Sequence, residues 1–270
     1  MPNSFAPQTA AAIAQARQHT LGDLLHRTAQ RYPDKLAVVA GERRATYAEF
    51  DEAVNRCANS LAARGLEKGD RLALISHNSL EFAVLAFATA RLGVVLVPVN
   101  FMVNAEETGF ILGHSGAKGI VIEDALAPTA ERAIAAAGLA GGVRGWIGLS
   151  DAAPTRDWED VGSWIAEGDP AAPDVAVADG DPLRLMYTSG TESRPKGVML
   201  SSKSLISQYV SCIVDGGMTP DDVEVQALPM YHCAQLPRVN FPRAPNPHPA
   251  SRSPHTPAAT PPGRPDSAAG

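Results

Sequence analysis

Apolar residues recur with helical spacing just after Thr46. The capping-box pattern is present, since Thr46 can act as the N-cap and Glu49 follows three residues later. The next apolar positions are separated by three or four residues and end before Gly65: Tyr47, Phe50, Val54, Cys57 and Leu61. This spacing places one apolar stripe along a helix. The pattern therefore predicts an amphipathic helix that begins after Thr46 and ends near Gly65.

The rest of the chain alternates between short β-branched runs and longer helical patterns. Strands are predicted over 71–76, 94–99, 118–123, 143–149, 183–188 and 223–229, and helices over 80–92, 105–114, 126–137 and 202–214. Residues 151–181 are rich in Asp, Pro and Gly, which predicts a long surface connection. Alternating strands and helices are typical of parallel βαβ units. The expected fold class is therefore α/β, with a parallel sheet covered by helices on both faces.

The most apolar stretch, 82–99, carries Arg91 near its middle and Gly93 soon after. A charge at that depth costs roughly 2.5–3.5 kcal/mol in a bilayer, so we expect a buried helix and strand and no integral membrane segment.

The N-terminus lacks the pattern of a signal peptide. The cysteines Cys57, Cys212 and Cys233 are scattered and form no metal-type pair, which suits a reducing compartment. We therefore expect a cytoplasmic location.

Charge and proline divide the chain into unlike parts. The whole chain has a net charge of −6, which argues against nonspecific binding of nucleic acid. Ten of the 22 prolines lie in residues 237–270, and the preceding 236 residues carry 19 basic and 28 acidic side chains, a net charge of −9. We expect an N-terminal extension (1–19), a folded body (20–236) and a disordered Pro/Arg/Ala-rich tail (237–270).

The segment 186–200 reads MYTSGTESRPKGVML and follows a predicted strand. Its glycines allow close approach of the backbone to a phosphate, its hydroxyls are donors, and Lys196 adds a positive charge. Ser, Thr and Gly are also common in ordinary polar turns, and composition alone leaves that alternative open. A Walker loop is excluded, because Pro195 replaces the required glycine and Gly197 replaces the hydroxyl residue that binds Mg²⁺.

This segment resembles the signature loop of adenylate-forming enzymes, the group that contains acyl-CoA synthetases, luciferases and the adenylation domains of peptide synthetases. The family pattern T-S-G-[ST]-T-G-x-P-K-G is matched at Thr188, Ser189, Gly190, Thr191, Pro195, Lys196 and Gly197. Glu192 and Ser193 depart from it. The resemblance implies that Thr188, Ser189, Gly190, Thr191, Lys196 and Gly197 bind the phosphates of ATP, and that Thr191 can contact Mg²⁺ through the nucleotide.

Further segments resemble the family in the same order, over roughly residues 20–236. They include LVPVN at 96–100, and PMYH at 229–232 is similar to the family's P-x-[FY]-H segment. The resemblance places His232 near the acyl and adenylate pocket, although an ordinary structural histidine stays an alternative. A Cys233–His232 nucleophile is disfavoured because adjacent side chains of an extended chain point to opposite faces. His19, His26, His77 and His114 are expected to be surface or structural residues.

The resemblance also implies a reaction. A carboxylate attacks the α-phosphate of ATP, giving an acyl-adenylate and pyrophosphate, and a thiol such as coenzyme A then takes the acyl group. The family's adenine-binding segment, its acidic residue for the ribose and its C-terminal catalytic lysine are not found in the sequence. We therefore expect a truncated acyl-CoA synthetase, inactive by itself, whose substrates are a carboxylic acid, ATP with Mg²⁺, and coenzyme A. The alternatives are a peptide-synthetase adenylation domain and a non-catalytic binding module, and the tail fits either a natural truncation or a frameshift.

Overall fold

The computed structural model describes residues 19–232 except 140, 151, 153–156, 189–193 and 220, together with the isolated positions Thr9 and Ile13. The predictions for the tail 237–270, for most of the extension 1–19 and for Cys233 lie outside the described residues. The same is true of three predicted phosphate-binding residues, Ser189, Gly190 and Thr191.

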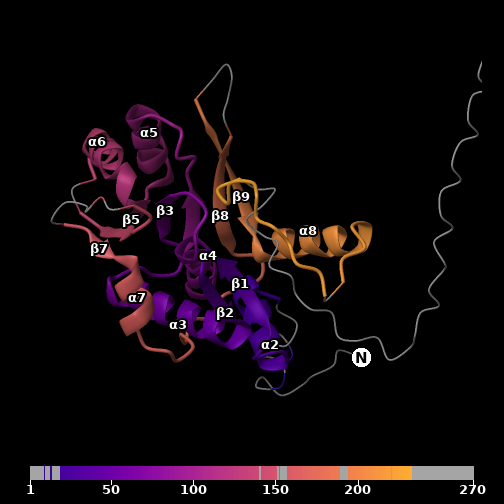
Figure 1. Ribbon diagram of the computed structural model, residues 1–270. Coiled ribbons are helices and arrows are strands. Elements are labelled where there is room, and N and C mark those ends of the chain that lie inside the picture. Colours follow the sequence, from indigo (N-terminus) through magenta and orange to yellow (C-terminus); the bar gives the residue numbers. More distant parts are fainter. Residues whose placement is uncertain are drawn as a thin grey trace, which may run out of the picture.

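Seven strands form one sheet in the centre of the molecule (Figure 1). The strands are β3 (Arg71–Ile75), β4 (Val95–Pro98), β5 (Gly119–Glu123), β6 (Val143–Ile147), β7 (Glu159–Asp160), β8 (Pro182–Thr188) and β9 (Lys196–Ser201). They are arranged in the order β7-β6-β5-β3-β4-β8-β9. Every neighbouring pair is parallel except β8 and β9, which form an antiparallel hairpin. The prediction of a mostly parallel α/β fold is confirmed.

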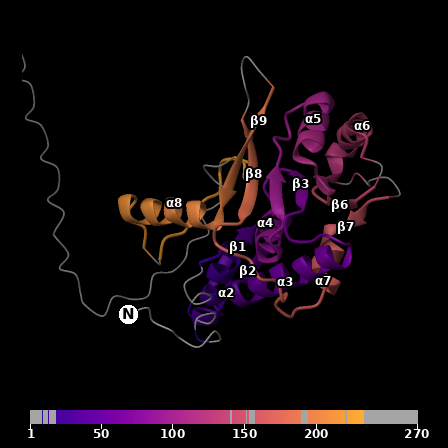
Figure 2. The same ribbon diagram turned by 180° about the vertical axis from the view of Figure 1, so that it is seen from behind.

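Helices cover both faces of this sheet (Figures 1 and 2). In β3, Leu72 and Leu74 belong to one apolar core while Ala73 and Ile75 belong to the other. The first core is shared with α2 (Leu21–Arg31), α3 (Tyr47–Ala63), α4 (Leu80–Leu92), α7 (Val161–Glu167) and α8 (Ser202–Asp215), and the second with α5 (Ala105–Ser115) and α6 (Ala127–Ala137). A strand buried on both faces must be apolar at every position, which explains the unbroken hydrophobic runs in the sequence.

The predicted helices after Thr46 and over 80–92 are confirmed. Thr46 Oγ1 accepts a hydrogen bond from the Glu49 backbone N–H, and the Glu49 carboxylate accepts one from the Thr46 N–H. Helix α4 ends at Gly93, whose φ of 69° is the left-handed conformation that favours glycine. Among the described residues, no helix is long and apolar enough to cross a membrane.

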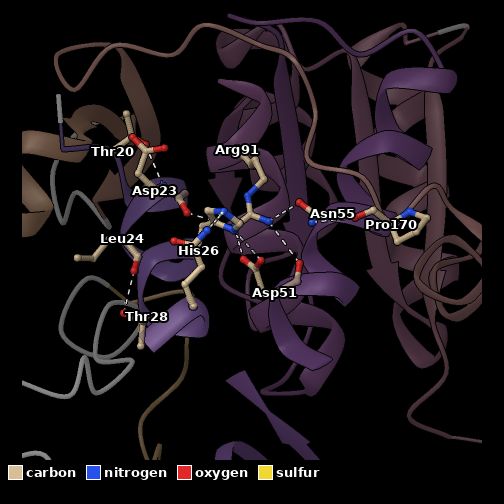
Figure 3. Close-up of polar contacts among 11 residues, drawn as sticks. Thr20, Asp23, Leu24, His26, Thr28, Asp51, Asn55, Arg91 and Pro170 are labelled. Atoms are coloured by element: carbon tan, nitrogen blue, oxygen red, sulfur yellow. Dashed lines mark hydrogen bonds and ion pairs between the residues drawn. The ribbon is translucent and has the colours of Figure 1, made fainter. Parts of the chain in front are cut away.

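Arg91 joins three helices inside the protein (Figure 3). Its side chain is 9% exposed, and its Nη2 donates to Asp51 Oδ1 at 2.6 Å and to the Gly22 carbonyl at 3.1 Å. Its Nη1 bonds Asn55, whose own Nδ2 donates to the Pro170 carbonyl at 2.9 Å. Because a buried guanidinium needs its donors paired, this network fixes α2, α3 and α4 relative to one another.

The prediction of a surface connection over 151–181 is wrong in part. Strand β7 and helix α7 lie within this range, and Trp158 and Trp164 are only 8% and 1% exposed. Gly145 in β6 makes room for the second indole, because a Cβ at Gly145 would lie 2.3 Å from Trp164 Cη2. Large aromatic side chains bury much apolar area, so they hold this polar segment against the sheet.

The prediction of a strand over 223–229 is wrong. The described residues of this segment pair with no strand, and Val223 and Val225 are 90% and 78% exposed. The alternating valines suggested a strand, but these residues enter neither of the two sheets among the described residues. Besides β7 and α7, the elements that were not predicted include helix α2, strand β9, and a two-stranded hairpin of β1 (Leu36–Ala40) and β2 (Arg43–Thr46).

Candidate functional site

The carboxyl ends of β3, β4, β5 and β8 meet at one edge of the sheet. His77 and Asn78 follow β3, Phe101 follows β4, Glu123 ends β5 and Thr188 ends β8. The chain places β4 on one side of β3 and then β5 on the other. Such a reversal opens a crevice at the carboxyl ends of the strands, where open α/β sheets bind their ligands. The predicted site residues Thr188 and His232 both lie near this edge.

The described residues of the signature segment lie at the end of β8 and the start of β9. Thr188 is the last residue of β8 and pairs with Lys196, the first residue of β9, while Tyr187 pairs with Gly197. Lys196 and Gly197 therefore belong to a strand, although the sequence suggested a continuous loop. The antiparallel pairing places Thr188 and Lys196 opposite each other at the base of the connecting residues 189–195. Both are exposed, so both are accessible to a ligand at the tip.

Gly197 has a packing role in this hairpin. A Cβ at this position would lie 2.8 Å from Leu185 Cδ1 and 3.4 Å from Tyr187 Cζ. Glycine thus lets the Tyr187 ring approach the backbone of the opposite strand, a cross-strand contact of the aromatic–glycine kind. The motif glycine is explained here by close packing within the hairpin, which is independent of any ligand.

Helix α5 contacts the same hairpin. His114 Nδ1 lies 2.8 Å from the Tyr187 hydroxyl oxygen, and the Arg194 guanidinium lies over the Phe110 ring, 5.5 Å from its centroid. Burial raises the pKa of Tyr187. His114, expected to be a surface or structural residue, is exposed and joins the helix to the signature segment. No sequence signal linked α5 to the hairpin, because 73 residues separate His114 from Tyr187.

His77 and Glu123 form a polar pair at the switch point of the sheet. Glu123 Oε2 accepts a hydrogen bond from the His77 backbone N–H at 2.8 Å and lies 2.7 Å from His77 Nδ1. The His77 ring stacks on Phe101 with centroids 3.7 Å apart, and Phe101 meets Tyr231 edge to face at 5.3 Å. The expectation that His77 is structural agrees with these contacts, and they link it to the segment that ends at His232.

Asn78 holds that segment in place with one side chain. Its Nδ2 donates to the carbonyls of Gln226 and Leu228 at 3.0 and 2.9 Å, and its Oδ1 accepts from the Met230 N–H at 2.7 Å. These three bonds replace the strand pairing that the sequence suggested. The segment then turns, since the His232 N–H donates to the Pro229 carbonyl at 3.0 Å. Sequence reasoning missed Asn78, because its partners lie about 150 residues away.

Within the described part of the chain, no group of three or more His, Cys, Asp or Glu side chains is arranged to hold a metal ion. The expected Mg²⁺ contact, Thr191, lies outside the described residues. A Mg²⁺ ion that arrives bound to a nucleotide needs few protein ligands, because the phosphates supply most of its oxygen ligands.

Comparison of the sequence with known proteins identifies related enzymes of one family. A model of the AMP-binding enzyme family matches residues 25–242. Long-chain-fatty-acid–CoA ligase FadD13 of Mycobacterium tuberculosis is 38% identical over 198 residues, which cover 73% of this chain and 38% of the relative. Feruloyl-CoA synthase of an Amycolatopsis species is 35% identical over 228 residues, which cover 84% of this chain and 42% of the relative.

A solved structure agrees with these relatives. The inhibitor-bound N-terminal domain of FACL13 from Mycobacterium tuberculosis aligns with a TM-score of 0.65 at 33% identity, covering 82% of this chain and 54% of that one. The chain thus spans about two fifths of the length of the curated relatives named above.

Proposed function

The chain belongs to the AMP-binding enzyme family, and we propose that it is the N-terminal part of an acyl-CoA synthetase whose β8–β9 hairpin binds the phosphates of ATP. The complete reaction activates a carboxylic acid as its adenylate, releases pyrophosphate and transfers the acyl group to coenzyme A. We choose coenzyme A over a carrier protein because both relatives described above are named for CoA products.

The single observation that carries this proposal is the hairpin. It places Thr188 and Lys196 opposite each other, so the connecting residues start and end at one point. Ser189, Gly190 and Thr191 would supply hydroxyl and backbone N–H donors there, Lys196 a positive charge and Gly197 a close backbone approach. Hydrogen bonds to a charged phosphate are worth about 1.5–3 kcal/mol each, so a few such donors bind a triphosphate usefully. Thr191 would reach Mg²⁺ held by the nucleotide.

We assign the acyl and adenylate site to the carboxyl-end edge of the sheet beside His232. The stack of His77, Phe101 and Tyr231 gives this region flat apolar surface, and Asn78 fixes the backbone leading to His232. Apolar walls with a few polar groups are typical of sites for small organic ligands.

We also propose a cytoplasmic location. Cys57 is a buried free thiol, and burial raises its pKa to about 12, which makes it unreactive. Free cysteines are typical of reducing compartments.

Binding of pyrophosphate by the 270-residue chain tests the hairpin assignment. Calorimetric titration should show that Lys196→Ala weakens pyrophosphate binding by about 10- to 150-fold, which corresponds to the loss of a charge-assisted hydrogen bond. Lys203→Ala is the matched control, because Lys203 is an exposed cation on α8 beyond the hairpin. Equal affinities of the wild type and Lys196→Ala would remove Lys196 from the phosphate site.

A further inference from the structure

We propose that helix α5 positions the phosphate-binding hairpin, with Phe110 and His114 as its positioning residues. This inference rests on the proposed function of the hairpin and goes beyond it, because neither residue belongs to the signature segment. In both views the helix stands beside the free end of the hairpin (Figures 1 and 2). Two pairs of side chains join the helix to the hairpin: His114 with Tyr187, and Phe110 with Arg194.

The contacts come from one face of the helix. Phe110 and His114 are four residues apart, so their side chains lie one above the other on α5. Their rings lie 5.3 Å apart at an interplanar angle of 27°. His114 reaches Tyr187 near the end of β8, and Phe110 lies under Arg194 just before β9. The helix therefore contacts the hairpin at Tyr187, just before Thr188, and at Arg194, just before Lys196.

The hairpin needs such support because the sheet gives it little near its tip. Strand β9 pairs only with β8 among the described strands, and the pairing of β8 with β4 is at Arg184, four residues before Thr188. Between Arg184 and Thr188, the only described strand that pairs with β8 is β9. This end of the hairpin is therefore attached to the body by the packing of Leu185 and Tyr187 on the core and by the polar and cation–π contacts with α5.

Attachment matters for binding because ordering a free segment costs conformational entropy. A segment that is already fixed in the bound conformation loses less freedom when the ligand arrives, so its affinity is higher. Arg194 is separated from Lys196 only by Pro195, whose φ is restricted. A guanidinium held on the Phe110 ring by a cation–π contact thus limits where the Lys196 backbone can lie.

Phe110 also packs against the core shared by α5 and α6, which is a purely structural contact. The two roles make different predictions. A structural role depends on apolar volume and affects the stability of the whole body. A positioning role depends on the aromatic face and on Arg194, and it affects ligand affinity at unchanged stability.

The test measures pyrophosphate affinity of the 270-residue chain by calorimetry, with the thermal midpoint of each variant measured in parallel. Phe110→Leu keeps an apolar side chain but removes the ring, and it should weaken binding about 2- to 10-fold. Phe110→Trp should restore the wild-type affinity or exceed it, since indole binds cations best. The matched control is Leu126→Ala, which trims another half-buried residue of the same core away from the hairpin.

A double-mutant cycle assigns the effect to the Arg194 contact. In an Arg194→Gln background, Phe110→Leu should change affinity by less than about 1.5-fold, because its partner is already gone. His114→Phe should weaken binding less than Phe110→Leu does, since it removes one hydrogen bond from an exposed site.

The outcomes separate the two proposals. Wild-type binding that is lost in Lys196→Ala but unchanged in Phe110→Leu would overturn the positioning role and leave the phosphate site standing. An equal effect of Phe110→Leu with and without Arg194 would overturn it too. Absence of pyrophosphate binding by the folded wild type would overturn the proposed function of the hairpin, and the inference with it.

Discussion

The central strands and the β8–β9 hairpin belong to one sheet but differ in what surrounds them. In β3, Leu72, Ala73 and Leu74 are fully buried, because helices cover both faces. In β9, Val198 is 45% and Met199 71% exposed. The central strands are held by exclusion of water on two sides, whereas the hairpin is attached to β4 near its base and depends toward its far end on its own pairing and on α5. The comparison shows that burial of apolar side chains stabilises the centre of the sheet, whereas the region that we assign to ligand binding keeps much of its surface in water.

Charged side chains also differ between the body and the hairpin. Arg91 is buried in the helical layer and bonded by Asp51 and Gly22, so its charge contributes to the architecture. Lys196 is exposed at the tip of the hairpin, so its charge stays accessible to an anion. Functional residues are commonly placed on mobile or exposed segments supported by a rigid scaffold. Substitutions in the two regions should therefore affect different measurements.

The largest expected effect is in the body. Arg91→Met removes the guanidinium from a buried ion pair and leaves the Asp51 carboxylate with its contact to His26 Nδ1 at 2.9 Å. Because that partner remains, the free energy of unfolding should fall by about 3–4 kcal/mol, the lower part of the range for breaking a buried ion pair. Urea titration followed by circular dichroism measures it, with the exposed Arg132→Ala as the control. A loss below about 1 kcal/mol would show that the network contributes little to the architecture.

A somewhat smaller effect is expected where β6 meets α7. Gly145→Ala forces a methyl group into the Trp164 indole and should cost about 1–3 kcal/mol of unfolding free energy. Combining it with Trp164→Leu should cost less than the sum of the two single changes, because the smaller side chain gives room for the methyl. If the two losses of unfolding free energy measured in urea simply add, the methyl group at position 145 does not press on the Trp164 indole.

The buried carboxylate of Glu81 should give the body a pH dependence. Burial is the largest single influence and opposes the charge. The hydrogen bond and positive charge of Arg43, together with hydrogen bonds from the Glu81 backbone and Ser79, outweigh it and lower the pKa of Glu81 below its ordinary value of 4.5. A lowered folded-state pKa stabilises the protein above pH 4.5 and loses that contribution as the pH falls further. The stability difference between wild type and Arg43→Gln should therefore be largest at neutral pH and shrink on acidification below pH 4.5. Urea midpoints measured from pH 7 to pH 3 check the sign, and a difference that grows in acid would contradict it.

A smaller effect is expected at Asn78, which attaches the exposed segment before His232. Asn78→Ala should lower global stability by about 1 kcal/mol, since its bonds are open to solvent. Amide exchange at Met230 should accelerate clearly, because that N–H loses its acceptor. Exchange at α4 should not change. Unaltered exchange at Met230 would show that other contacts hold the segment.

The smallest effect is expected on the exposed face of the hairpin. Met199→Ser should change the free energy of unfolding by less than about 0.5 kcal/mol, because the side chain is already mostly in water. The matched change in the body, Leu74→Ala, should cost about 2–5 kcal/mol. Similar costs at the two positions would mean that the hairpin is packed as tightly as the centre of the sheet.

The elements predicted best are those whose pattern is enforced by burial. The helix after Thr46 and helix α4 were predicted within one or two residues, because capping side chains and a terminal glycine act locally. The central strands were also predicted, since burial on both faces leaves only apolar residues there. Strand β9 was missed because its motif residues read as loop chemistry, and its pairing with β8 is visible only in the folded hairpin.

By itself, the sequence determined the α/β class, the family resemblance and the residues of the signature segment, because periodicity, caps and motifs are local or repetitive signals. Only the tertiary structure decided that Trp164 is core, that residues 223–229 form no strand, and that Phe110, His114 and Asn78 lie against the candidate site. These facts depend on contacts between residues about 20 to 150 positions apart. Such contacts form through the shape of the whole sheet, and no short stretch of sequence contains them.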